Sequence, residues 1–192
     1  WSKSEEAKEL LQDMLGPQAG LPPGAYFSLL RPYSEIQIAR YFARLSEYHP
    51  VITSCNRAFR QGVEDARWCG DCDKCRFIFL ILSPYIPATS LTRMFADNLL
   101  DNPTQLEGYR ALLGLHEHRP FECVGEQAES MLALHWISAR GEWSNSAVVK
   151  ALVAEIPELL TAQPGLEEQV LGQRHGIIEM PHAFENLGSV LA

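Results

Sequence analysis

The sequence predicts an α/β domain with a metal site, followed by an all-helical extension. Apolar stretches and a helical pattern alternate as strand, helix and strand between residues 26 and 53, an order typical of a parallel sheet. Four cysteines with metal-ligand spacing follow the second stretch. Later segments show helical periodicity. We therefore expect an α/β domain with the metal site over residues 1–84 and a helical extension over 85–192.

Both expected strands are short. The first, YFSLL at 26–30, is apolar and aromatic, and the second, VIT at 51–53, is β-branched and delivers Cys55 at its end. Ser34 lies three residues before Gln37, which has the spacing of a capping box and predicts a helix between the strands. Two strands are too few for a stable sheet, so we expect further strands in a segment preceding Trp1.

Helix signals dominate elsewhere. An amphipathic helix begins near residue 5, and Gly16-Pro17 is expected to end it. Asn102-Pro103 predicts a helix start, and Gly114 its end. The expected helices after the cysteines cover residues 76–82, 90–99, 102–113, 126–139 and 145–160.

Composition narrows the class of protein. With 46% hydrophobic and 21% charged residues, the 192-residue chain has the profile of a soluble globular protein. A formal net charge of −8 argues against a nucleic-acid binder, and the longest apolar run, 77–82, is far shorter than the ~20 residues of a membrane span. The first residues, WSKS, do not resemble a signal peptide, so we expect a cytoplasmic protein; a first residue other than Met predicts a fragment.

The cysteines are the most informative feature. Two C-x-x-C steps share their middle cysteine, and a further thiol lies upstream. Together these thiols supply the four ligands of a tetrahedral zinc, and a site closed by four sulfurs is structural rather than catalytic. Disulfides, which need an oxidising compartment, and an iron–sulfur cluster are the alternatives. The expected ligands are Cys55, Cys69, Cys72 and Cys75.

Arginines surround these cysteines in the sequence. Arginine forks suit phosphate and carboxylate oxygens, so Arg57, Arg60 and Arg76 are expected to bind substrate or phosphate, together with Asn56. Arg57 and Arg76 lead because each lies close to a cysteine ligand. The alternative is that these arginines form surface ion pairs with nearby acidic residues.

Several motifs carry a resemblance. The segment RPYSEI at 31–36 and the run CGDCDKCR at 69–76 resemble the C-terminal half of PP-loop ATP pyrophosphatases, such as the 7-cyano-7-deazaguanine synthase group. The segments SCNRAF at 54–59, KCRFIFL at 74–80 and PFECVGE at 120–126 more closely resemble the UDP-N-acetylmuramoyl-L-alanyl-L-glutamate epimerase family (MurL). The resemblance covers most of the chain and implies an adenine-nucleotide-hydrolase-like fold.

The resemblance implies an isomerase of peptidoglycan synthesis. Such an enzyme inverts the terminal L-glutamate of UDP-MurNAc-L-Ala-L-Glu to D-glutamate, using ATP and magnesium. Activating the glutamate carboxylate with ATP removes its charge and makes the neighbouring α-proton more acidic. The glycine-rich G-G-K-D-S-type loop of the wider class is absent from the sequence, and we expect it to precede Trp1.

Inversion needs a base that removes the α-proton and an acid that returns one. Cys123 is the one cysteine outside the expected metal set, and Glu122 and Glu126 flank it. These three residues are the expected catalytic groups. The alternative is that Cys123 is a buried, small apolar residue.

Two other functions stay open from the sequence. One is a PP-loop ligase that makes a nitrile or an amide on a small heterocycle, and a substrate test separates it from the epimerase. The other is a non-enzymatic, zinc-stabilised binding module, which an ATP-binding loop upstream would exclude.

Overall fold

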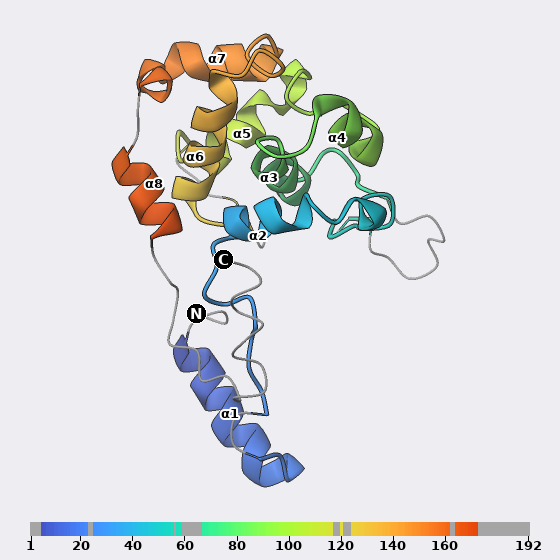
Figure 1. Ribbon diagram of the computed structural model, residues 1–192, viewed down its shortest axis with the longest axis vertical. Helices are drawn as coiled ribbons and strands as arrows, with labels where there is room; N and C mark the ends of the chain where they lie inside the picture. Colours follow the sequence, from blue (N-terminus) through green and yellow to red (C-terminus); the bar gives the residue numbers. More distant parts are fainter. Residues whose placement is uncertain are drawn as a thin grey trace. The chain divides into compact units, whose positions relative to one another are not determined.

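A computed structural model describes residues 5–22, 25–55, 57–58, 67–116, 120, 124–161 and 164–172 (Figure 1). The chain divides into two compact units, residues 1–34 with 173–192 and residues 35–172. Residues on both sides of the expected boundary at 84/85 lie in the second unit.

The first unit contains helix α1, Glu5–Ala19. The helix runs past Gly16 and includes Pro17, so the expected end at Gly16-Pro17 is wrong. A proline near a helix end removes one hydrogen bond but leaves the following residues able to stay helical. The loop that follows returns to the helix, where the Gln12 side-chain amide donates to the Tyr26 carbonyl at 2.7 Å.

The predicted α/β fold, of the adenine-nucleotide-hydrolase-like (PP-loop) type, is wrong, because the described residues form helices and loops and contain no strand. Residues 26–30 and 51–53 lie in turns and loops: Tyr33 N–H donates to the Leu30 carbonyl at 3.1 Å, and Val51 N–H donates to that of Tyr48 at 3.1 Å. Val51 is 76% exposed. β-Branched composition favours a strand only where a neighbouring strand supplies hydrogen bonds and packing, and here neither stretch has one within the described chain.

The second unit is a bundle of helices and short 3-10 turns. Its helices start close to the predicted signals: α2 begins directly after Ser34, α6 directly after Glu126, and a 3-10 turn after Asn102, whose side chain accepts from Thr104 N–H. The stretch expected as one helix over 145–160 divides at Pro157. The elements are α2 (Glu35–Phe42), η1 (Ser46–Tyr48), α3 (Asp73–Leu82), α4 (Ala88–Phe95), η2 (Pro103–Gln105), α5 (Leu106–Leu112), α6 (Gln127–Ser138), α7 (Ala147–Glu155), η3 (Pro157–Leu160) and α8 (Pro164–Leu171).

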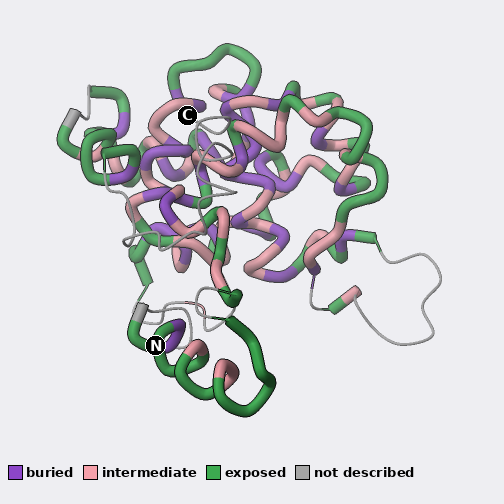
Figure 2. The backbone as a smooth tube through the Cα atoms, turned by 60° about the horizontal axis from the view of Figure 1, so that its bottom comes forward, coloured by how far each residue is buried: buried purple, intermediate pink, exposed green. Residues whose placement is uncertain are grey.

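Helix α3 is the centre of this unit, and helices α2, α4, α5 and α6 pack against it (Figure 1). Its sequence, DKCRFIFLIL, is apolar on nearly every side after the first turn, which is typical of a helix buried all round. The Phe79 ring meets the rings of Phe95 and Trp143 edge-on, at centroid distances of 5.1 and 5.9 Å. Buried segments gather in this bundle in Figure 2.

Gly125, at the entry to α6, leaves no room for a side chain. A Cβ added there would overlap the Glu129 carboxylate and the Phe77 ring. Glycine therefore lets the start of α6 approach α3 closely.

We predict that Gly125→Ala lowers the free energy of unfolding by about 1–3 kcal/mol, the usual cost of forcing extra atoms into a packed site. Urea denaturation measures the change. Gly141→Ala is the matched control, because nothing lies within 4 Å of a Cβ at Gly141, and its effect should stay within about 0.5 kcal/mol. Equal effects of the two substitutions would contradict the packing argument.

Candidate metal centre

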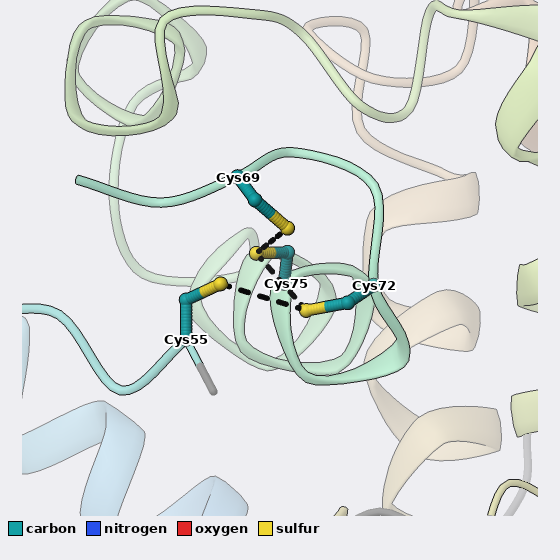
Figure 3. A group of neighbouring side chains, drawn as sticks. All are labelled: Cys55, Cys69, Cys72 and Cys75. Carbon is teal, nitrogen blue, oxygen red and sulfur yellow. Dashed lines mark hydrogen bonds between the residues drawn. The ribbon is translucent and has the colours of Figure 1, made fainter. Parts of the chain in front are cut away.

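The four cysteines meet at the start of α3 (Figure 3). Cys75 lies in the first turn of α3, and Cys72 is its N-cap residue, with extended backbone angles. Gly70 adopts a positive φ of 70°, which reverses the chain so that Cys69 faces the same point. Cys55 arrives from the loop after η1.

The sulfur positions fit one metal ion. All four Sγ atoms lie within 4.8 Å of one another. The Sγ–Sγ distances are 3.8 Å for Cys55–Cys72, 3.7 Å for Cys69–Cys75 and 3.5 Å for Cys72–Cys75. Four sulfurs placed about 2.3 Å from a tetrahedral zinc are about 3.8 Å apart. A disulfide needs about 2.05 Å, and all four cysteines are free. The residues predicted as ligands can therefore bind a metal together.

Burial and neighbouring groups shift the pKa values of three of the four thiols. Burial raises the pKa of Cys72 to about 11, and burial together with the Cys72 thiol raises the pKa of Cys75. Burial acts to raise the pKa of Cys55 too, but hydrogen bonds from the backbone of Cys69 and Ala58 lower it to about 7. Several buried thiolates side by side repel one another, and a bound divalent cation removes this cost.

Neighbouring groups fix the position of the loop that carries Cys69. Trp68 is buried and stacks on Phe95 of α4 at a centroid distance of 4.5 Å, which fixes the chain just before Cys69. Asp71 N–H donates to Cys69 Sγ at 3.4 Å, which holds the Cys69 side chain against its own loop.

Two of the predicted substrate-binding residues lie at this centre. Arg57 is half exposed, and its NH1 donates to the Asp71 carbonyl at 2.9 Å. Arg76 is only 12% exposed, and its Nε, NH1 and NH2 donate to Gln105, Asp73 and Asp71 respectively. Asn56 and Arg60 lie outside the described residues.

Of the three predicted catalytic residues, Cys123 and Glu122 lie outside the described residues. Glu126 is exposed and is the N-cap residue of α6; its N–H donates to Glu129 Oε2 at 2.7 Å. Glu129 is buried, and its Oε1 accepts from Ile36 N–H at 3.3 Å. One buried carboxylate thus binds the N-termini of both α2 and α6.

The sequence analysis did not identify three residues that support the site. Glu129 binds two helix N-termini, Gln105 accepts from Arg76, and a Cβ at Gly108 would overlap the Arg76 guanidinium. The E-x-x-E spacing of Glu126 and Glu129 is a capping signal that points to the first of them. A glycine inside a helical pattern, as at Gly108, often marks a close approach. No local signal identifies Gln105, because its partner Arg76 lies 29 residues away.

The comparison with known protein families identifies the class of protein to which this chain belongs. The family model described as the MurL C-terminal domain matches residues 51–167, which include all four cysteines. The match covers more than half of the chain, so this chain belongs to the MurL C-terminal domain family.

The curated relatives make the class more specific. A protein of Salinispora tropica is 51% identical over 158 residues, covering 82% of this chain and 34% of the relative. A protein of a Micromonospora species is 48% identical over 158 residues, covering 82% of this chain and 35% of the relative. A protein of Xanthomonas oryzae pv. oryzae is 49% identical over 137 residues, covering 70% of this chain and 30% of the relative. Each is named UDP-N-acetyl-alpha-D-muramoyl-L-alanyl-L-glutamate epimerase.

The chain therefore spans about a third of the length of these relatives. No solved structure gives a significant match to it. Within the described part of the chain, no helix has the length and apolar character to cross a membrane.

We predict that the buried Glu129 makes stability depend on pH. Burial raises its pKa above the ordinary 4.5, so near this pH the folded chain holds a proton that the unfolded chain releases. This contribution to stability is present below about pH 4.5 and is lost as the pH rises through the raised pKa. The stability of the wild type relative to Glu129→Gln should therefore be greatest at low pH.

Urea denaturation of both proteins from pH 4 to 8 measures this difference. Both proteins share the cysteine cluster, so any effect of pH on that cluster is common to the two. A difference that is independent of pH would show that Glu129 titrates normally.

Proposed function

We propose that this chain is the C-terminal part of a UDP-N-acetyl-α-D-muramoyl-L-alanyl-L-glutamate epimerase, an isomerase of peptidoglycan precursor synthesis. The observation that supports this most strongly is an identity of about one residue in two to three relatives of that name, over a region that includes the metal centre. The proposed substrate is the UDP-linked muramoyl dipeptide that the relatives' name describes.

We propose further that the metal is one structural zinc. Four cysteines are the ligand set of closed zinc sites, and their sulfur separations match a tetrahedron of that size. Three of the four cysteines are buried, which leaves little access for a substrate. The role of the zinc is to join the loop that carries Cys55 to the N-terminus of α3.

We propose that the whole enzyme uses ATP and magnesium. ATP supplies activation of the glutamate carboxylate, which makes the α-proton removable. The 192-residue sequence contains no G-G-K-D-S-type loop, and the relatives are about three times as long as the region aligned to this chain. We therefore assign nucleotide binding to another part of the full-length protein.

The chemical roles follow from residue type and position. Arg57 is half exposed beside Cys55, and we propose that its donors other than Nη1, which bonds to Asp71, bind substrate oxygens together with Asn56 and Arg60. Arg76 was expected to share this role, but three of its donors are occupied within the protein. Cys123 remains the proposed base.

We propose Glu122 and Glu126 as the alternative acid–base groups to Cys123. The exposure of Glu126 at the N-terminus of α6 is compatible with this role.

The zinc proposal predicts about one zinc per chain in protein purified under reducing conditions. Cys72→Ser should remove the metal and much of the stability, because metal binding and folding are coupled. Elemental analysis and thermal melting measure the two effects. Cys123→Ser is the matched control and should retain its zinc. Wild-type protein without zinc would exclude this proposal.

The epimerase proposal predicts proton exchange at the glutamate α-carbon. In deuterated water with ATP, magnesium and UDP-MurNAc-L-Ala-L-Glu, the full-length enzyme should produce the D-glutamyl epimer with deuterium at that carbon. Mass spectrometry and chiral analysis of the released glutamate measure both changes. Cys123→Ser should slow the reaction by about 10²-fold or more if the thiol is the base. Unlabelled epimer would refute proton abstraction.

A further inference from the structure

The metal ligands come from two separate segments, and the chain must hold these segments together. Cys55 lies on the loop after η1, whereas the other three ligands lie within residues 69–75. Thirteen residues separate the two segments in the sequence. A metal ion can join them, but a second connection, formed by protein groups alone, also exists.

The first link of this connection is Arg57 with Asp71. Arg57 is two residues after Cys55, and Asp71 lies between Cys69 and Cys72. Arg57 NH1 donates to the Asp71 carbonyl at 2.9 Å and to its carboxylate at 3.3 Å. The two ligand segments are therefore joined by an arginine–aspartate contact beside the sulfurs.

The second link ties Asp71 to the helical body. Arg76 NH2 donates to the Asp71 carboxylate at 3.0 Å, and Arg76 Nε donates to Gln105 Oε1 at 2.8 Å. Arg76 is 12% exposed, and Gln105 is buried in η2. Hydrogen bonds of a charged, desolvated guanidinium in fork geometry are strong and directional.

The surroundings of Arg76 are shaped to receive it. A Cβ added at Gly108, in α5, would overlap the guanidinium and its adjoining methylene. The absence of a side chain at Gly108 lets α5 lie directly against Arg76. The guanidinium is thus confined by α5 on one side and by its acceptors Asp71, Asp73 and Gln105.

We infer that Arg57, Asp71, Arg76 and Gln105 form a positioning network for the metal centre, and that this network sets how tightly the metal binds. None of the four supplies a sulfur ligand. They hold the two ligand segments close to their bound positions, so less conformational entropy is lost when metal binds. The metal affinity therefore depends on residues that are not themselves ligands. This inference rests on the proposed zinc centre.

Gln105 offers the sharpest test, because it is uncharged and contacts the centre through Arg76. In the full-length protein, Gln105→Leu removes the acceptor at similar volume and leaves the charges unchanged. We expect zinc to bind 10–100-fold more weakly, the usual effect of losing an outer contact of a metal site. Gln105→Glu keeps an acceptor for Arg76 and should restore most of the affinity. Competition with a chelator measures the affinity, and cobalt absorption bands report on the thiolate geometry.

Gln127→Leu is the matched control. The Gln127 amide donates to the Leu113 carbonyl at 2.8 Å, so this variant also loses a side-chain hydrogen bond, but one that involves neither ligand segment. Its zinc affinity should equal that of the wild type. Equal zinc affinities in Gln105→Leu and Gln127→Leu would overturn the network. Failure of the wild type to bind zinc would instead overturn the zinc proposal.

A second variant keeps the test decisive if Gln105→Leu does not fold. The Asp71 side chain is 69% exposed, so Asp71→Ala should leave the core intact while it removes acceptors of both arginines. We expect this variant to bind zinc more weakly, and unchanged affinity would contradict the inference. The double variant with Gln105→Leu should lose less affinity than the two single losses combined, because both residues act through Arg76.

Discussion

The meeting of four thiols at the N-terminus of α3 is the constraint on which the described part of the second unit depends. Cys75 belongs to the same helix that places Phe77 and Phe79 in the core, so the cysteine cluster and the hydrophobic core share one helix. Thiolates crowded at a buried site repel one another, and a cation converts this repulsion into attraction. The geometry of the loop and the packing of α3 are therefore linked through Cys75 and through the Arg76–Asp71 contact.

Buried polar groups orient the helices around α3. Glu129 accepts from the N-terminal region of α2 and from that of α6, which is favourable because both helix N-termini carry partial positive charge. Trp143 Nε1 donates to the Ser83 carbonyl at 3.0 Å, just beyond the end of α3. The Ile36–Glu129 and Ser83–Trp143 bonds join residues far apart in the sequence, so they restrict how the helices can pack. Apolar packing supplies stability, and these bonds select one arrangement.

This organisation indicates what the chain would contribute to the proposed epimerase. The described residues build a stable helical body with a closed four-cysteine centre, which is the character of a structural module. Chemistry on a UDP-muramoyl dipeptide requires nucleotide and acid–base groups as well. Of the residues predicted for the substrate and catalytic sites, Arg57 and Glu126 are exposed in the described chain; Arg57 is bonded to Asp71, and the Glu126 side chain caps α6. The rest of the machinery is proposed to involve Cys123 and other parts of the full-length protein.

The sequence by itself determined the local features and the family. The cysteine spacing identified the four thiols that could bind a metal together, and the signals at Ser34, Asn102 and Glu126 located helix starts, because these features depend on neighbouring residues alone. Tertiary structure decided the rest. Residues 26–30 and 51–53 have the composition of strands but lack partner strands within the described chain. The guanidinium of Arg76 donates to the side chain of Gln105, which lies 29 residues away in the sequence. Strand pairing and buried hydrogen bonds depend on which distant residues meet, and no local pattern contains that information.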